Sequence, residues 1–209
     1  MTGPAIREAT SEDVAAFTGI LARSFAPDAL IRWLYLNERN QTRLHHRFLA
    51  HQLRTEYLPA KGIEVAVDES GAVLGGAAWA APDARKASRA GKFLLVPRAV
   101  ATMGVRDFGE YGRRGRALVE ALVAARPKRP HWYLSLLATD PDRQRGGVGR
   151  SLLRHRLATT RLPAYLECVT GNVAYYERYG FRVTGELGLP TEAPKLYSMW
   201  REPTAQPCS

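Results

Sequence analysis

The chain has 209 residues, of which 45% are hydrophobic, 24% charged and 9% aromatic. This composition is typical of a globular protein and excludes a disordered chain or a fibrous repeat. Thirty basic against twenty acidic residues give a formal net charge of +10, which attracts polyanions without choosing between nucleic acid, acidic lipid and a phosphorylated small molecule.

The chain is not expected to enter a membrane or the secretory pathway. The longest uncharged stretch, residues 71–82, is shorter than the ~20 residues that cross a bilayer. The N-terminal residues lack an apolar stretch behind a basic start, so we expect a cytoplasmic protein. Cys168 and Cys208 are too few for a disulfide framework and have no metal-site spacing, and both are expected to be free thiols.

The N-terminal half predicts a strand, three helices and a β-hairpin. Apolar residues recur at helical spacing in three stretches, and Thr10 to Asp13 has the N-cap and acidic residues typical of a helix start. Two short apolar runs flank the turn at 69–72. The predicted elements are a strand at 6–9, helices at about 13–25, 28–35 and 44–57, and hairpin strands at 63–67 and 73–80.

The C-terminal half predicts alternating strands and helices. Residues 82–92 are polar and are predicted to form a surface loop, and 97–126 predict one or two loosely joined helices, interrupted by glycines. We therefore expect one mixed α/β domain over residues 1–201 with a frayed tail at 202–209. The remaining predicted elements are a strand at 131–139, a helix at 148–160, a strand at 164–168, a helix at 172–179, and strands near 181–187 and 196–201.

A glycine-rich and arginine-rich segment lies between the strand at 131–139 and the helix that follows it. Glycines at a strand-to-helix turn leave backbone N–H groups uncovered, and the helix N-terminus adds partial positive charge. A pyrophosphate fits such a turn, and arginines supply further counter-charges. The residues concerned are Gly146, Gly147 and Gly149, with Arg143, Arg145 and Arg150.

Two common phosphate-binding motifs are excluded by what this segment lacks. A P-loop ends in Gly-Lys-Ser/Thr, whereas here Arg150 and Ser151 follow Gly149. A dinucleotide fingerprint has a third glycine at the position that Leu152 occupies.

The segment resembles a known family at these residues. Gln144 to Gly149, QRGGVG, is similar to the Q/R-x-x-G-x-G/A signature of the GNAT superfamily of N-acetyltransferases, whose loop binds the pyrophosphate of acetyl-coenzyme A. Downstream, 166–168 (LEC), Asn172 and 176–181 (YERYGF) look like the family's N…YExxGF segment. Within the superfamily the last eighty residues are similar to puromycin N-acetyltransferase and its relatives, notably at PKRPHWYL and PAYLE. The first 125 residues resemble the family only in their order of elements.

The resemblance implies a fold and a co-substrate. The fold is α/β (α+β): a mixed, mostly antiparallel central sheet with a splayed strand pair, flanked by helices. The co-substrate is acetyl-CoA, with no metal. The residues implied in binding it are the backbone of Leu137, Ala138 and Thr139 for pantetheine, Gln144, Arg145, Gly146, Gly147, Val148, Gly149 and Arg150 for the phosphates, and Asn172 for the pantetheine arm.

The implied reaction is direct attack of a primary amine on the acetyl carbonyl. Tyr176 would protonate the leaving thiolate, although a packing role in a tyrosine cluster is the alternative. The strand 132–139 has no carboxylate, so Glu167 is the candidate for a base or substrate anchor, against a purely structural role as hydrogen-bond acceptor. The backbone N–H of Leu137 would stabilise the oxyanion.

Other constellations support no further chemistry. His45, His46 and His51 lack the spacing of a metal site and are expected on a solvated helix face. Cys168 has no His partner in a recognisable motif and is expected to be a small buried hydrophobe.

Three functions remain open. The first is acetylation of a small-molecule amine by a monomer or homodimer. The second is acetylation of a protein or peptide, although a basic surface repels basic tails. The third is a nucleic-acid-binding module, against which the arginines are dispersed and no aromatic-basic recognition motif is present.

Overall fold

The computed structural model describes residues 3–38, 41–82 and 96–203, with the helix backbone alone for 96–107. Most of the loop predicted at 82–92, most of the tail predicted at 202–209, and Cys208 lie outside this part. Within it, strands form one seven-stranded sheet in the order β1-β2-β3-β4-β5-β7-β6. The strands are β1 (Ala5–Glu8), β2 (Ile63–Val67), β3 (Val73–Ala80), β4 (Trp132–Thr139), β5 (Ala164–Val169), β6 (Arg182–Glu186) and β7 (Leu196–Arg201).

The sheet is antiparallel except at its centre. There β4 and β5 run parallel and pair only from Trp132 opposite Ala164 to Leu134 opposite Leu166. Beyond Leu134 the two strands diverge, although β4 continues to Thr139. The predicted mostly antiparallel sheet with a splayed strand pair is confirmed.

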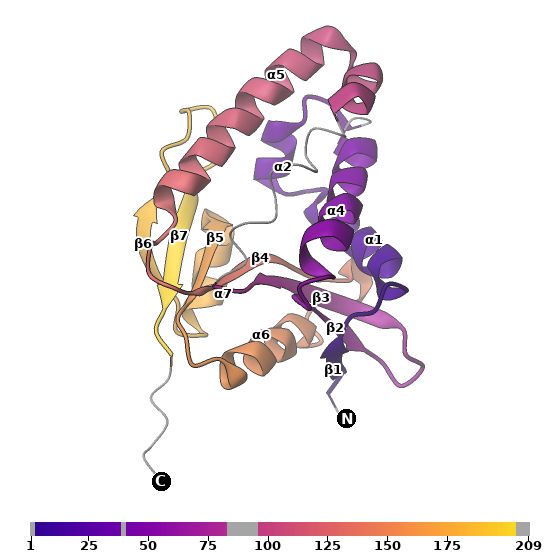
Figure 1. The fold of residues 1–209 in the computed structure, drawn as a ribbon, viewed down its shortest axis with the longest axis vertical. Helices are drawn as coiled ribbons and strands as arrows, with labels where there is room; N and C mark the ends of the chain where they lie inside the picture. Colours follow the sequence, from indigo (N-terminus) through magenta and orange to yellow (C-terminus); the bar gives the residue numbers. More distant parts are fainter. Residues whose placement is uncertain (1–2, 39–40, 83–95, 204–209) are drawn as a thin grey trace.

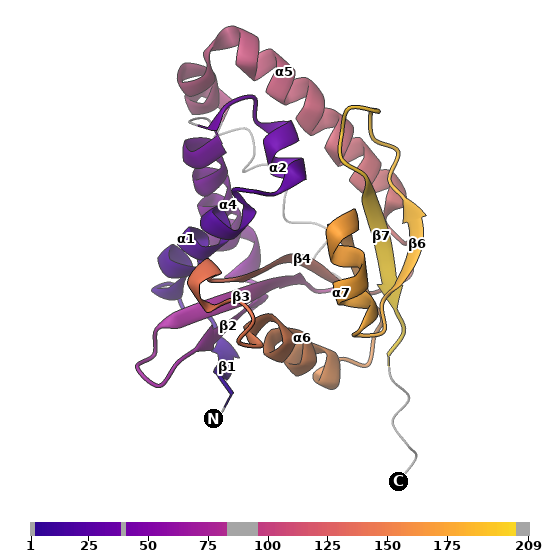
Figure 2. The same cartoon turned by 180° about the vertical axis from the view of Figure 1, so that it is seen from behind.

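Helices cover both faces of the sheet (Figures 1 and 2). On one face α1 (Asp13–Phe25) packs on β3 and β4, and buries Val14, Phe17 and Leu21. On the other face α6 (Val148–Thr159) packs on β2 and β3 and buries Leu152 and Leu153. Each helix thus completes one of the two main hydrophobic clusters of the core.

The start of α1 is fixed by Asp13. Both oxygens of its carboxylate accept hydrogen bonds from the Arg7 guanidinium, at 2.7 and 2.8 Å, and one also accepts from the backbone N–H of Thr10. These bonds, led by the one from Arg7, lower the pKa of Asp13 to about 2. The pair joins β1 to the first turn of α1 and satisfies a nearly buried carboxylate.

We expect Asp13→Asn to lower the free energy of unfolding by about 2 kcal/mol at pH 7. This is the free energy that corresponds to the lowering of the Asp13 pKa from 3.8 to about 2 on folding. Because the folded pKa is the lower one, this stabilisation is present above the unfolded pKa and is lost as pH falls through about 2. Urea unfolding of both proteins at pH 7 and pH 2 measures it. A difference between variant and parent that is the same at both pH values would contradict the assignment.

The regions predicted as helices at 28–35 and 44–57 are helical in the structure. Asp28 caps α2 (Ala29–Leu34) by accepting from the N–H groups of Leu30 and Ile31. A second helical stretch follows, with π-helical turns η1 (Gln41–His45) and η2 (Leu53–Tyr57) on either side of α4 (His46–Gln52). Leu49 and Leu53 bury this stretch against α1.

The segment predicted as one or two helices is the single helix α5 (Val96–Ala125). Gly109 and Gly112 lower helix propensity by up to ~1 kcal/mol each relative to alanine, and no other atoms crowd them. The helix continues because its C-terminal half buries Ala121 against Leu187 and Leu196. Tertiary packing therefore overrides the local glycine signal.

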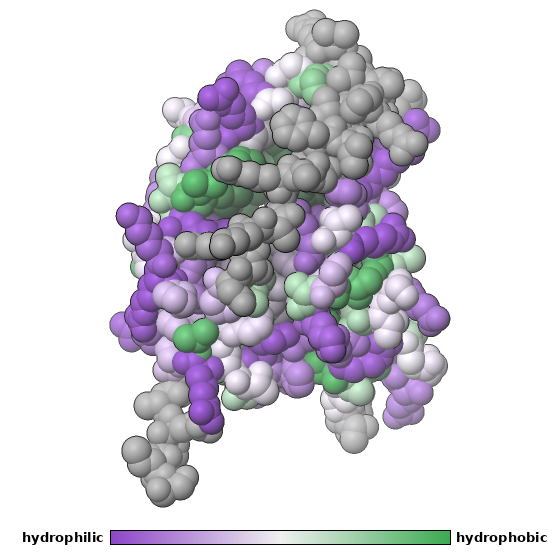
Figure 3. All heavy atoms as spheres, in the orientation of Figure 1, coloured by the Kyte–Doolittle hydropathy of each residue, from purple (hydrophilic) through white to green (hydrophobic). Residues whose placement is uncertain are grey.

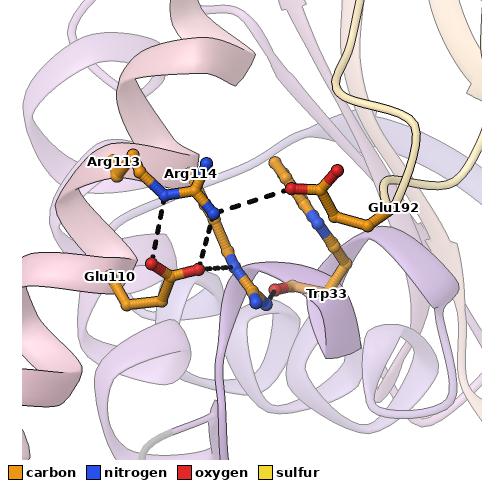
Figure 4. Close-up of polar contacts among 5 residues, drawn as sticks. All are labelled: Trp33, Glu110, Arg113, Arg114 and Glu192. Atoms are coloured by element: carbon orange, nitrogen blue, oxygen red, sulfur yellow. Dashed lines mark hydrogen bonds and ion pairs between the residues drawn. The ribbon is translucent and has the colours of Figure 1, made fainter.

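Polar contacts hold the middle of α5 to its neighbours (Figure 4). Glu110 accepts from Arg113 and from Arg114, each at 2.7 Å. Arg114 also donates to the carbonyl of Trp33 on α2, and Arg113 lies 3.6 Å from Glu192 before β7. These contacts fix α5 above the central strands, where it crosses the molecule in Figure 1.

Three further short elements complete the part of the chain that the structure describes. They are η5 (Pro141–Arg143), η6 (Thr170–Asn172) and α7 (Val173–Glu177), so the helix predicted at 172–179 is shorter than expected. No helix among the described residues is both long and apolar enough to cross a membrane.

Candidate active site

A cavity of about 1680 Å³ lies where β4 and β5 diverge. Its walls come from α2, the helical stretch 41–57 and α5, and its floor from β4, β5 and α7. Val119 and Val123 of α5 are exposed beside it, and Figure 3 shows hydrophobic atoms along α5 on a mostly hydrophilic face. The splayed strands thus open into a large, mainly apolar chamber.

A β-bulge on β4 accompanies the divergence. Leu136 pairs with Ala78 and Leu134 with Trp79, so Ser135 is an extra residue without a partner on β3. A bulge of this kind bends its strand and re-aims the side chains next to it. The Ser135 side chain lies on the cavity wall, where it hydrogen-bonds Tyr57.

Beyond the bulge, the register of β4 determines which of its backbone groups bond to β3 and which face the gap between β4 and β5. Asp140 N–H donates to the carbonyl of Leu74, and antiparallel pairs alternate between bonded and non-bonded. Ala138 therefore bonds to β3, whereas the backbone groups of Leu137 and Thr139 point toward the gap. The Thr139 carbonyl accepts from the Ser24 hydroxyl at 2.8 Å, which leaves the Leu137 N–H facing the cavity.

The loop between β4 and α6 has the geometry of an anion site. Arg145 and Gly147 have φ of 69° and 80°, and Gly147 is the N-cap of α6 with no side-chain cap. The first-turn N–H groups of α6 therefore lack intrahelical and capping partners, and carry the positive end of the helix dipole. Arg150 lies over Gly147, 3.1 Å from where a Cβ would be. These residues fit a phosphate group.

Gly149 lies where the first turn of α6 packs closely against Tyr175. A Cβ at this position would lie 2.8 Å from the Tyr175 hydroxyl, so any side chain would displace Tyr175. Tyr175 and Tyr176 are neighbours on α7 with ring centroids 5.2 Å apart. The first turn of α6 and the helix that carries Tyr176 are therefore in direct contact.

Glu167 lies on β5 and lines the cavity. Burial raises the pKa of its carboxyl group, while hydrogen bonding to Tyr133 and Tyr165 opposes the rise. Its Oε1 is buried and has no hydrogen-bond partner among the described residues. A carboxyl group with a raised pKa and an unsatisfied oxygen is a better proton acceptor than an ordinary exposed carboxylate.

Sequence reasoning missed three side chains around Glu167. Tyr57, Tyr133 and Arg126 all line the cavity, and the Arg126 guanidinium lies 4.1 Å above the centre of the Tyr133 ring. Burial raises the pKa of Tyr57 to about 12, and that of Tyr133 rises for the same reason. Both phenols stay protonated at neutral pH and can donate hydrogen bonds. Tyr57, Tyr133 and Arg126 come from three separate segments of the chain, and no local sequence motif predicts that they meet.

Tyr176 and Asn172 line the same cavity from the side of α7. Burial raises the pKa of Tyr176, so its phenol is protonated at neutral pH. Its ring packs edge-on against Phe181, with centroids 6.0 Å apart. A protonated phenol in this position can act as an acid. Packing against Phe181 accounts for the aromatic ring of Tyr176 but not for its hydroxyl group.

Of the residues named from the sequence, the cavity brings together Leu137, Glu167, Asn172 and Tyr176. The loop from Gln144 to Arg150 lies outside the cavity lining, at the far end of β4. A ligand that contacts both would have to run along β4.

One histidine expectation was wrong. His45 is buried between Phe25 and Tyr35, with ring centroids 6.2 and 5.8 Å away, instead of lying on a solvated face. Burial lowers the pKa of His45 to about 4, so the ring is neutral at pH 7. His46 is exposed, as expected. Among the residues described, no group of three or more His, Cys, Asp or Glu side chains is placed to hold a metal ion.

Cys168 is a buried free thiol next to Glu167, which confirms its reading as a small packed hydrophobe. Its Sγ lies 3.6 Å from Met199 Sδ, and burial raises the pKa of the thiol to about 11. The protonated thiol is a poor nucleophile.

Comparison with known proteins agrees with this geometry. Residues 110–183, which include the loop, Glu167, Asn172 and Tyr176, match the family model of the acetyltransferase (GNAT) domain. The chain is 28% identical to a protein of Corynebacterium glutamicum described as histone acetyltransferase HPA2 and related acetyltransferase, with a TM-score of 0.70 over 99% of this chain and 100% of that one.

Two more distant structures share the fold. An N-acetyltransferase from Staphylococcus aureus is 16% identical over 94% of this chain and 99% of its own, with a TM-score of 0.63. A mosquito protein described as arylalkylamine N-acetyltransferase like 5b is 15% identical over 94% of this chain and 98% of its own, with a TM-score of 0.60. The family match, together with the splayed strands, shows a GNAT acetyltransferase domain over residues 110–183 in a chain that has the fold of GNAT acetyltransferases.

Proposed function

We propose that the protein transfers the acetyl group of acetyl-CoA to the primary amine of a small molecule. The observation that carries this proposal is the single cavity that holds Glu167 and Tyr176 beside the splay of β4 and β5. Its volume of about 1680 Å³ exceeds the ~300–1,000 Å³ of ordinary ligand pockets, so it has room for a pantetheine arm and an acceptor together.

Acetyl-CoA would supply an activated thioester. The N–H groups at the start of α6, with Arg145 and Arg150, would hold its phosphates, because this loop fits an anion. The backbone of Leu137 and Thr139 would hold the pantetheine amides, and Asn172 would contact the pantetheine arm. The register of β4 favours Leu137 and Thr139 over Ala138, whose backbone groups bond to β3.

The residues around the splay would perform the transfer. Glu167 accepts one proton from the acceptor ammonium and releases it to water, which frees the nitrogen lone pair. Leu137 N–H donates to the carbonyl oxygen as the N–C bond forms. Tyr176 gives its proton to sulfur as the C–S bond breaks, and the second nitrogen proton restores the phenol. The products are an amide and coenzyme A.

A small-molecule acceptor is favoured by the shape of the cavity. Apolar and aromatic side chains from α2 and α5 form its walls, as in pockets that enclose small ligands. The segments PKRPHWYL and PAYLE, which resemble puromycin N-acetyltransferase, favour the same choice. The competing acceptor is a protein lysine, because the Corynebacterium glutamicum relative is described as a histone acetyltransferase.

Coenzyme A release decides between the two acceptor classes. Initial rates of thiol production should be at least tenfold higher with members of a panel of small amines than with lysine-containing histone-tail peptides at equal concentration. Turnover confined to the peptides would overturn the small-molecule assignment. Absence of turnover with every amine and peptide would overturn the proposed reaction.

A cofactor-site variant tests the loop separately. Acetyl-CoA should raise the melting temperature of the protein, because a ligand that binds only the folded state stabilises it. Gly147→Asp should abolish the rise, since a Cβ at φ 80° is strained and a carboxylate would enter the phosphate site. Gly188→Asp, in open space outside the site, is the matched control and should keep it. A folded Gly147→Asp protein with the full rise would rule out this loop.

A further inference from the structure

Arg126, the residue that follows α5, contributes a cation to the lining of the cavity. It is half-buried, and its guanidinium stacks on Tyr133 at 4.1 Å. Stacking holds the planar group in one orientation, which prepares it for bidentate contact with a carboxylate.

The Arg126 guanidinium makes no salt bridge in the part of the chain that the structure describes, although Glu167 is close enough to feel its charge. Other arginines of this region differ: Arg129 lies 2.6 Å from Glu202, and Arg116 lies 2.8 Å from Glu120. The Arg126 Nε is buried and makes no hydrogen bond to the described residues. A partly desolvated charge without a partner is costly, and an anionic ligand would offset that cost.

Arg126 and Glu167 lie on the same small area of cavity wall. Tyr133, beneath the guanidinium, pairs with Tyr165 on β5, and Glu167 is two residues further along the same face of β5. Arg126 lowers the pKa of Glu167 through its charge, as expected for groups that are close but not bonded. The cavity wall therefore carries a cation and an acid close to each other, each with a buried polar atom that has no hydrogen-bond partner among the described residues.

A zwitterion complements this pair. An α-amino acid carries an ammonium group and a carboxylate on one carbon, so both can reach neighbouring charges of opposite sign at once. A simple amine would engage Glu167 and leave Arg126 without a partner. The wall toward this pair suits an apolar side chain, because Leu118 and Leu122 lie one to two helical turns before Arg126 and cluster with Leu30.

We propose that the acceptor is a free amino acid with a large apolar side chain, whose amine faces Glu167 and whose carboxylate pairs with Arg126. This inference rests on the proposed transfer to a small-molecule amine and names its substrate class. The N–C bond forms and the C–S bond breaks as before, and the products are an N-acetyl amino acid and coenzyme A.

Matched pairs of acceptors test the carboxylate. Phenylalanine, leucine and tryptophan are each compared with the amine that lacks the carboxyl group and with the methyl ester that hides its charge. We expect kcat/KM for the amino acid to exceed that of both matched compounds by about 10- to 100-fold, the range of a charge-assisted bidentate contact.

Arg126→Met then assigns the preference to this residue, because methionine keeps an apolar stem over Tyr133. The ratio of kcat/KM for phenylalanine over phenethylamine should fall about 10- to 100-fold. Arg129→Met, three residues away and outside the cavity lining, removes the same charge and should leave the ratio at its parent value. Arg126→Lys should recover part of the ratio.

The outcomes separate this inference from the proposed function. Acetylation of the simple amines or esters as fast as the amino acids would overturn the amino-acid assignment and leave the transfer to small amines standing. An unchanged ratio in a folded Arg126→Met protein would overturn the role of Arg126. Absence of thiol release with every compound would count against both the substrate class and the proposed function.

Discussion

Replacing Glu167 with glutamine is expected to lower kcat by about 10²–10⁴, the range for loss of a general base. Glutamine preserves the shape and can still accept hydrogen bonds from Tyr133 and Tyr165, but its amide cannot take the proton of an acceptor ammonium. Steady-state thiol release on matched protein samples measures the loss. A purely structural carboxylate predicts instead a lower melting temperature with kcat retained.

The pH dependence distinguishes a base from an anchor. Burial raises the pKa of Glu167, and the base must be ionised to act, so kcat/KM should fall as pH decreases through that raised pKa. The acid limb should be absent in Glu167→Gln at every pH at which the protein is folded. Persistence of the limb in the variant would assign it to another group.

Glu64 provides a matched control for a buried carboxylate. It lies on β2, 3.0 Å from the Arg156 guanidinium and 3.2 Å from His155 Nδ1, both on α6. Glu64→Gln should therefore reduce stability without the 10²–10⁴ loss in kcat. Equal losses in kcat for the two variants would show that burial of a charge, and not base catalysis, explains the result at Glu167.

The contrast between loop and cavity shows which features a single sequence can predict. The loop from Gln144 to Gly149 is local, because glycines, a helix start and arginines within eight residues define its geometry. A tight strand-to-helix turn was predictable from these residues, whereas the left-handed φ of Arg145, which is not a glycine, was not. The order of strands and helices was predictable for the same reason.

The acceptor end of the cavity is non-local and was not predictable. Tyr57, Arg126 and Tyr133 lie on three elements that meet only after the sheet has formed. The bulge at Ser135 breaks the period of two along β4 without a glycine to mark it. His45 lies between Leu44 and His46 in a mostly polar stretch, yet the rings of Phe25 on α1 and of Tyr35 enclose it.

Replacing Tyr176 with phenylalanine is expected to lower kcat by about 10²–10⁴ while the dissociation constant of acetyl-CoA stays within about twofold. Phenylalanine keeps the edge-on packing against Phe181, so binding and chemistry should separate. Burial raises the pKa of Tyr176, so the phenol that the variant lacks is protonated in the parent protein at neutral pH.

The size of this loss should depend on the acceptor. A weakly basic amine makes expulsion of the thiolate harder, so the absence of the acid should cost most with the least reactive amines. Tyr179→Phe, three residues further along the chain and outside the cavity lining, is the control and should retain parent rates. Parent kcat in Tyr176→Phe across the amine series would leave Tyr176 as a packing residue. In that case the thiolate would take its proton from water, because the thiol of coenzyme A is not a strongly basic leaving group.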